Sequence, residues 1–179
     1  MLPVKETQRL LFRELELSDA EAMFEMDSDP DVHLYLGNNP VKNIDEVKLV
    51  IENLQWQYKT FGMGRMAVVL KETNEFIGWA GFKRERNLKD RGIFCDLGYR
   101  FLKKHWGKGY ASESAKAFVK HGFTVMKLEK INAYADAVHT ASRKVLEKAG
   151  LQYIETFDLD GVEEVWYEML NPNTYAEKS

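Results

Sequence analysis

The sequence predicts an α/β domain in which helices cover the faces of a mixed sheet. Its 179 residues suffice for one domain with a sizeable core and are few for two, so we expect a single domain over residues 1–179. The spacing of apolar residues changes along the chain from the helical period to the strand period and back. One β-α-β unit, from residue 92 to 135, is expected to place its two strands parallel with a right-handed crossover.

The N-terminal part combines one strand with two helices. An apolar run predicts a strand at 9–15, and a helix follows at 17–26. Ser18 is the predicted N-cap of this helix, because a glutamate three residues later has the spacing of a capping box. Turn residues and aromatics predict a loop over 29–43. Helical periodicity then runs over 43–62 and stops at a glycine.

The middle of the chain has the strand period. Three β-rich runs, at 65–72, 75–84 and 92–102, are separated by short polar segments. Three short strands joined in this way predict an antiparallel meander.

The C-terminal part returns to mixed elements. A helix with one apolar face is expected from Ala111 to Met126, and a strand follows at 130–136. The helix at 140–150 is predicted to end at Gly150, the residue that best fits a left-handed C-cap. The strands 151–159 and 162–170, joined at an Asp-Gly turn, complete seven strands and four helices.

Composition excludes several classes of function. The formal net charge of −3 gives no electrostatic reason to bind nucleic acid or an anionic membrane. The single cysteine, Cys95, excludes an internal disulfide and lies in an apolar strand, which is typical of a core residue rather than a nucleophile. The four histidines lack the spacing of metal ligands, so no metal is expected. No signal peptide or membrane-length apolar run is visible, which predicts a cytoplasmic protein.

Two glycines, Gly107 and Gly109, lie between the strand at 92–102 and the helix that begins near Ala111. A helix N-terminus offers unpaired N–H groups and a partial positive charge, and glycines let an anion approach them closely. A plain turn is the alternative for a lone Gly-x-Gly. A dinucleotide fingerprint fits poorly because its third glycine would fall at Ser112, and the longer phosphate loop of nucleotide triphosphatases is absent. The remaining interpretation is a compact pyrophosphate cradle.

The chain resembles the GNAT N-acetyltransferases in four segments. The acyl-CoA motif of that family is similar to CDLGYRFLKKHWGKGYASESAKAFVKHGF. The segments TQRLLFRELELSDAEAMFEM, EFIGWAGF and TASRKVLEKAGL match, in the same order, the branch that acetylates N-terminal amines of ribosomal proteins. The resemblance covers nearly the whole chain. It implies a seven-stranded, mostly antiparallel sheet with splayed central strands and about four helices, and acetyl-CoA as co-substrate.

The resemblance also implies a set of residues for acetyl-CoA. In the family, the strand before the glycine loop separates from its neighbour and lends backbone groups to the pantetheine arm. The matching positions in this chain are Tyr99, Arg100 and Phe101. The matching pyrophosphate residues are Lys104, which stands where the family usually has Gln or Arg, and Trp106, Gly107, Lys108, Gly109, Tyr110 and Ala111.

The helix at 140–150 carries the other implied positions. The ribosomal-protein branch has an asparagine that contacts the cofactor arm near the sulfur, followed three residues later by a serine. Here these positions are His139 and Ser142. Many other GNAT enzymes use a tyrosine as the acid, at the position of Leu146. Ser142 is therefore the implied group that bonds the leaving sulfur, although the sequence alone favours an ordinary serine of the first helical turn.

The chemistry requires a neutral amine that attacks a thioester, whose thiolate leaves readily because a thiol pKa is ~8.5. At pH 7 an α-amine with a pKa of ~7.8 is neutral in roughly one molecule in seven, which costs about 1 kcal/mol. A lysine amine with a pKa of ~10.4 costs about 5 kcal/mol. An N-terminal acceptor therefore needs little help from a base, whereas a lysine or a polyamine needs a real one.

Two carboxylates are candidate bases. Asp96 interrupts the apolar run IFCDLGYRF, where a carboxylate is either exposed at a sheet edge or functional. Glu164 lies in the last strand and is more typical of a solvated strand face. Backbone N–H groups of the splayed strand are expected to stabilise the oxyanion.

These observations predict an N-acetyltransferase that moves an acetyl group directly to a primary amine, such as a protein N-terminus, without a covalent enzyme intermediate. A small-molecule acceptor, such as a polyamine, an amino acid or an aminoglycoside, is the first alternative. A non-catalytic acyl-CoA-binding module is the second, and it is favoured by His139 and by the lack of a tyrosine at position 146. Both a monomer and a homodimer are compatible with the sequence.

Overall fold

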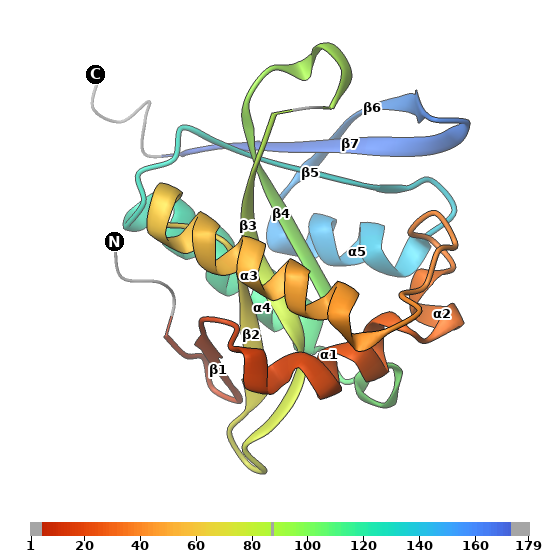
Figure 1. Cartoon of the computed structure of the whole chain (residues 1–179). Coiled ribbons are helices and arrows are strands. Elements are labelled where there is room, and N and C mark those ends of the chain that lie inside the picture. The colour runs from red at the N-terminus through yellow and green to blue at the C-terminus, as the bar shows by residue number, and fades with distance from the viewer. Residues whose placement is uncertain (1–4, 87, 173–179) are drawn as a thin grey trace.

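The computed structural model describes residues 5–86 and 88–172, in which seven strands and five α-helices alternate along the chain (Figure 1). In chain order these elements are β1 (Leu10–Arg13), α1 (Ala20–Asp27), α2 (Pro30–His33), α3 (Ile44–Phe61), β2 (Arg65–Leu70), β3 (Glu75–Glu85), β4 (Phe94–Phe101), α4 (Tyr110–Thr124), β5 (Lys130–Asp136), α5 (Thr140–Ala149), β6 (Gln152–Leu159) and β7 (Val162–Leu170). Three 3-10 turns join them: η1 (Leu17–Asp19), η2 (Lys89–Arg91) and η3 (Lys103–His105).

The strands form one sheet in the order β1-β2-β3-β4-β5-β7-β6. Every neighbouring pair is antiparallel except β4 and β5, which are parallel because the chain crosses over through α4 between them. The structure therefore confirms the predicted seven-stranded, mostly antiparallel sheet, the meander of β2, β3 and β4, and the parallel pair of the β-α-β unit.

The two central strands separate soon after they meet. β3 and β4 pair continuously from Gly78–Phe101 to Glu85–Phe94. Over the described residues, β4 and β5 pair only at Asp96 and Asn132. Figure 1 shows the consequence, because β2, β3 and β4 run up the view while β5, β6 and β7 cross its upper part. The predicted splay of the central strands is thus confirmed, and a gap opens between β4 and β5 beyond Asp96.

The helices cover both faces of the sheet. Successive residues of a strand point to opposite faces. The Tyr99 hydroxyl donates to the Ser142 carbonyl in α5 at 2.8 Å, whereas Arg100 donates to the Asp27 carboxylate in α1 at 2.7 Å. α1 and α5 therefore lie on opposite faces, and Figure 1 shows α1 and α3 in front of the sheet with α4 and α5 behind it. The main core is formed on both faces of the sheet.

The first helix begins later than the sequence predicts. The turn η1, whose N-cap is Glu16, precedes α1, whose N-cap is Asp19. Ser18 therefore does not cap the helix. The buried Asp19 carboxylate accepts from the Glu16 N–H at 2.9 Å and pairs with the Arg13 guanidinium at 2.6 Å. This tertiary ion pair fixes the chain at Asp19, because a buried carboxylate must be paired.

A fifth helix, α2, lies in the segment that was expected to be a loop. The Asp29 carboxylate accepts from the Asp31 N–H at 2.9 Å, and Pro30 occupies the first turn, where its fixed φ suits a helix. The predicted helix ends are confirmed elsewhere. Gly62 and Gly150 close α3 and α5 with φ of 64° and 102°, in the left-handed region that favours glycine.

Candidate active site

The glycine loop between η3 and α4 has the geometry of an anion cradle. Gly107 and Gly109 have φ of 73° and 84°, a left-handed conformation that costs glycine little. Gly109 is the N-cap of α4 and brings no side chain to cap it, so the first N–H groups of the helix lack an intrahelical partner. A Cβ placed on Gly107 would meet no heavy atom within 4 Å, which shows that the space beside the loop is open. These residues fit a pyrophosphate held by backbone N–H groups.

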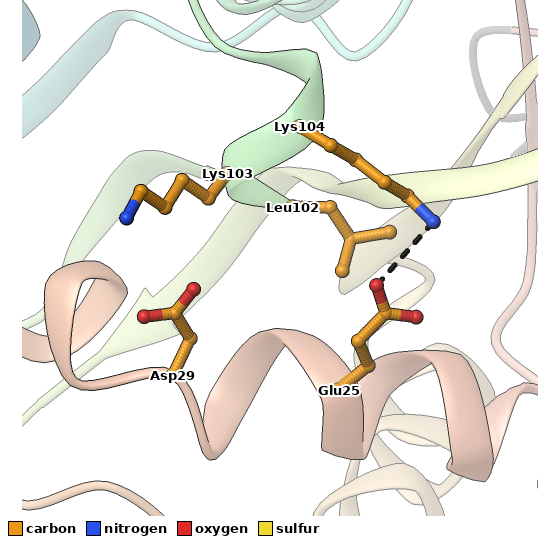
Figure 2. A pocket seen from close by; sticks show the side chains of 5 residues that line it. All are labelled: Glu25, Asp29, Leu102, Lys103 and Lys104. Carbon is orange, nitrogen blue, oxygen red and sulfur yellow. Dashed lines mark ion pairs between the residues drawn. The ribbon is translucent and has the colours of Figure 1, made fainter.

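The two lysines that precede the loop are paired with acidic residues. Lys103 binds Asp31, and the Lys104 ammonium lies 3.3 Å from Glu25 and 3.0 Å from Glu75. Figure 2 shows Lys103 and Lys104 facing α1 across a cavity of about 470 Å³ that Leu102, Glu25 and Asp29 also line. The positive charge of Lys104 is therefore offset by one carboxylate of α1, Glu25, and one of β3, Glu75.

The rest of the loop is anchored to the neighbouring elements. The Trp106 indole N–H donates to the Phe101 carbonyl at 2.8 Å, which ties the loop to the end of β4. Lys108 lies exposed between the two glycines. Tyr110 and Ala111 begin α4 and pack partly against the main core.

The backbone of β4 faces its two neighbours in turn. The Leu102 N–H donates to the Ile77 carbonyl in β3 at 3.0 Å. Because hydrogen bonding alternates along an antiparallel strand, Arg100 also directs its backbone to β3, whereas Tyr99 and Phe101 direct theirs towards β5. Beyond Asp96 that side is the gap, so the Tyr99 N–H and carbonyl are the predicted groups that can meet a ligand there.

Ser142 meets the side chain of Tyr99 at the edge of the gap. Its Oγ lies 3.1 Å from the Tyr99 hydroxyl, which donates to the Ser142 carbonyl at 2.8 Å. Burial raises the pKa of Tyr99 above its ordinary value, so the phenol keeps its proton at neutral pH. Leu146 is 2% exposed and belongs to the main core. Two hydroxyl groups, from β4 and α5, therefore lie together where the resemblance implied only one.

His139 precedes α5 and stacks on Tyr35. The two ring centroids are 4.2 Å apart and the rings are inclined by 15°. Tyr35 lies just after α2, so the stack joins segment 29–43 to the start of α5. Burial lowers the pKa of His139, which leaves the imidazole neutral at pH 7. An uncharged imidazole ring therefore lies at the start of α5, three residues before Ser142.

Asp96, the other candidate base, is buried and paired rather than exposed at an edge. Burial raises the pKa of its carboxyl, and the Arg65 guanidinium opposes that shift. Asp96 is 6% exposed and lies in the centre of the sheet, where β4 still pairs with β5. Its carboxylate binds the Arg65 guanidinium, which also donates to the Asp96 carbonyl at 2.9 Å. A buried carboxylate that is committed to a guanidinium has a structural explanation, which the sequence did not offer.

Glu164 is the candidate base that the geometry favours. It pairs across the strands with Asp136, four residues beyond Asn132 on β5, and lies on the same face as Asp96. Glu164 is half-buried rather than on a solvated face. Burial, and then the neighbouring Asp136 charge, raise the pKa of Glu164 to about 7. A carboxylate with such a pKa can exchange protons at neutral pH.

Cys95 and the metal-binding residue types offer no second site within the described residues. Cys95 packs partly buried against the main core, and burial raises the pKa of its thiol to about 12. No cluster of three or more His, Cys, Asp or Glu suitable for a metal occurs among the described residues. None of the helices in the described ranges is long and apolar enough to cross a membrane.

Sequence reasoning missed the side chains of Tyr99 and Tyr35. The alternation along β4 places Tyr99 on the face of Cys95 and Leu97, which points to a helix rather than to solvent. That alternation could have indicated a buried hydroxyl. The contact of Tyr35 with His139 joins segments that are far apart in the sequence, and no local signal predicts it.

Known proteins share both the sequence pattern and the fold. The protein-family model described as acetyltransferase (GNAT) domain matches residues 9–152 of the sequence. The N-acetyltransferase p20 of Bacillus licheniformis is 32% identical over 146 residues, which cover 82% of this chain and 80% of that protein. The crystal structure of a GNAT-family acetyltransferase from Bacillus anthracis is 30% identical, covers 93% of this chain and 97% of that one, and superposes with a TM-score of 0.78.

Two further structures share the fold at lower identity. One is a spermidine N-acetyltransferase from Vibrio cholerae in complex with CoA and spermine, at 19% identity over 92% of this chain and 97% of that one, with a TM-score of 0.74. The other is the ribosomal-protein-S5-alanine acetyltransferase from Vibrio fischeri, at 18% identity over 94% and 96%, with a TM-score of 0.74. The matched segment contains the glycine loop and the gap between β4 and β5, and the chain therefore belongs to the GNAT family of acetyl-CoA-dependent N-acetyltransferases.

Proposed function

We propose that this enzyme transfers the acetyl group of acetyl-CoA directly to a weakly basic primary amine, namely the α-amine of a peptide or protein. The observation that supports this most strongly is the arrangement around the gap between β4 and β5. The glycine loop lies at the end of β4, Ser142 lies on the α5 face, and Glu164 lies on the α1 face. The thioester of acetyl-CoA and the acceptor amine can therefore reach the gap from opposite faces of the sheet.

The proposed binding mode uses backbone groups before side chains. The N–H groups of Gly107 to Ala111 hold the pyrophosphate at the start of α4, with Lys108 as the nearby exposed cation. The Tyr99 N–H and carbonyl bond the pantetheine arm in the gap. When bound, acetyl-CoA supplies the activated acetyl group.

The proton balance follows from the two hydroxyl groups and the carboxylate. Glu164 takes one proton from the ammonium, directly or through a water, and the neutral amine nitrogen then attacks the carbonyl carbon. The C–S bond breaks, and the proton that the new amide nitrogen loses passes to the leaving sulfur. The Ser142 hydroxyl donates a hydrogen bond to that sulfur, and Tyr99 holds Ser142 in place. Backbone N–H groups that face the gap stabilise the negative charge that develops on the carbonyl oxygen.

The pKa of Glu164 favours a weakly basic acceptor. An α-ammonium with a pKa of ~7.8 loses its proton to a carboxylate of pKa about 7 at a cost of about 1 kcal/mol. A lysine ammonium with a pKa of ~10.4 would cost about 5 kcal/mol. The base is therefore matched to an N-terminal amine.

The test is release of free CoA thiol in the presence of matched amines. One peptide should be offered with a free N-terminus, with an acetyl-blocked N-terminus and a free lysine, and with both amines blocked, beside spermidine and a free amino acid. Thiol release that requires the free N-terminus supports the proposal. Thiol release only with spermidine or the amino acid would show that the acceptor is a small molecule. Binding of acetyl-CoA without thiol release in the presence of any amine would favour a binding module.

A further inference from the structure

The segment just before β1 contacts the glycine loop through the side chain of Arg9. Its Nε donates to the Glu113 carboxylate in the first turn of α4 at 2.7 Å. One terminal nitrogen donates to the Lys108 carbonyl, inside the loop, at 3.0 Å. The guanidinium carbon lies 4.5 Å from the centroid of the Tyr110 ring. Arg9 therefore contacts both the loop and the helix that the loop begins.

Glu113 needs a counter-charge because of where it lies. Its carboxylate also accepts from the Thr7 hydroxyl at 2.6 Å and from the Arg9 N–H at 3.0 Å. Burial alone would raise the pKa of Glu113, but these bonds and the guanidinium hold the pKa below its ordinary value, so the group is ionised at neutral pH. A second negative charge at the end of α4 that holds a pyrophosphate would repel that ligand unless it were neutralised.

We propose that Arg9 is a positioning residue of the acetyl-CoA site. It cancels the charge of Glu113 beside the phosphate cradle, and it holds the Lys108 carbonyl so that the loop can turn its N–H groups towards the pyrophosphate. Its second terminal nitrogen lies 3.4 Å from the position of a Cβ on Gly109, so the cation itself borders the cradle. This inference rests on the proposed binding of acetyl-CoA at the glycine loop.

The first test compares Arg9→Gln with Arg13→Gln. Arg13 lies four residues later, at the end of β1, pairs with Asp19 at 2.6 Å and is 36% exposed, against 42% for Arg9. Its hydrogen bonds go to Glu14 and Asp19 rather than to the loop. We expect Arg9→Gln to raise the Kd and the KM for acetyl-CoA about tenfold with little change in kcat, because it removes uniform binding of the donor. Arg13→Gln should lower the unfolding temperature but leave both constants unchanged.

The second test removes the charge that Arg9 is proposed to cancel. Glu113→Gln in the Arg9→Gln background should restore acetyl-CoA affinity to within about threefold of the unsubstituted enzyme, as expected when one charge offsets the other. Arg9→Lys keeps the charge but lacks the guanidinium that bonds Glu113 and Lys108 at the same time. Its KM for acetyl-CoA should therefore lie between those of Arg9→Gln and the unsubstituted enzyme. S-acetyl-pantetheine, which lacks the pyrophosphate, should be used equally well by Arg9→Gln and by the unsubstituted enzyme.

The outcomes separate this inference from the proposed function. Equal acetyl-CoA affinity in Arg9→Gln and the unsubstituted enzyme overturns the role of Arg9. An equal loss with S-acetyl-pantetheine also overturns it, because general damage to the fold would then explain the effect. If the unsubstituted enzyme does not bind acetyl-CoA, the proposed function fails instead.

Discussion

Replacing Glu164 by Gln is expected to lower activity and raise stability together. If Glu164 takes the proton of the amine, kcat should fall by about two orders of magnitude or more, the usual contribution of a general base. In the unsubstituted enzyme, kcat/KM should rise with pH through an apparent pKa near 7, because the carboxylate must be ionised. That limb should disappear in Glu164→Gln.

The effect on stability follows from the same pKa. The pKa of Glu164 is about 7 in the folded state against 4.5 ordinarily, so between these values the folded state binds more protons than the unfolded state and stability falls as pH rises. The difference corresponds to about 3 kcal/mol, which solvent screening of a half-buried group reduces to about 1–2 kcal/mol. Glu164→Gln should therefore be more stable by this amount at pH 8 and equal to the unsubstituted enzyme near pH 4.

The assay is thiol release between pH 5.5 and 9, together with urea unfolding at pH 4 and pH 8. Two acceptor amines of different pKa distinguish ionisation of the acceptor from ionisation of the enzyme. A rise in kcat/KM that is due to the enzyme occurs at the same pH with both amines. Glu163→Gln is the matched control, since Glu163 is the exposed neighbour on the same strand. If Glu164→Gln keeps half of the kcat/KM and the limb near pH 7, Glu164 is not the base.

Three further substitutions test other parts of the site. Gly109→Ala places a Cβ at a φ of 84°, which costs about 1–2 kcal/mol, and should weaken acetyl-CoA binding at least tenfold in calorimetry. Gly37→Ala, at a φ of 77° in an exposed turn, should not. Tyr99→Phe should lower kcat about tenfold at unchanged acetyl-CoA affinity, and adding Ser142→Ala should lower it little further; additive losses would mean that the hydroxyls act separately. Arg65→Met leaves Asp96 buried without its partner and should cost about 3–5 kcal/mol in urea unfolding, much of which Arg65→Met with Asp96→Leu should recover.

The fold was largely predictable because its signals are local. Apolar periodicity located every strand of the sheet, and glycines marked the ends of α3 and α5. The two differences have causes that a periodic pattern does not show. The start of α1 follows a capping box between Glu16 and Asp19 and the ion pair of Asp19 with Arg13 in β1. α2 is a single helical turn, too short to show a periodic pattern.

Without the family resemblance, the residues indicate most clearly the part of the site that is made of backbone. Gly107 and Gly109 are visible in the sequence because their conformation requires glycine. The bond between Tyr99 and Ser142 joins residues that are 43 positions apart, and the bond between Arg9 and Glu113 spans 104. The base was ambiguous for the same reason, since tertiary packing pairs Asp96 with Arg65 and raises the pKa of Glu164.

Among the described residues, β4 and β5 pair at one position, Asp96 with Asn132, and each partner is held within its own part of the sheet. Asp96 is fixed through Arg65 to the Gly81 carbonyl of β3. The Asn132 amide donates to Glu168 of β7 at 2.9 Å. Because the strands separate from this position onward, the pair forms the closed end of the gap in which the acyl thioester is proposed to bind. Substitutions of Asp96 or Asn132 are therefore expected to change the preference between acetyl and longer acyl thioesters.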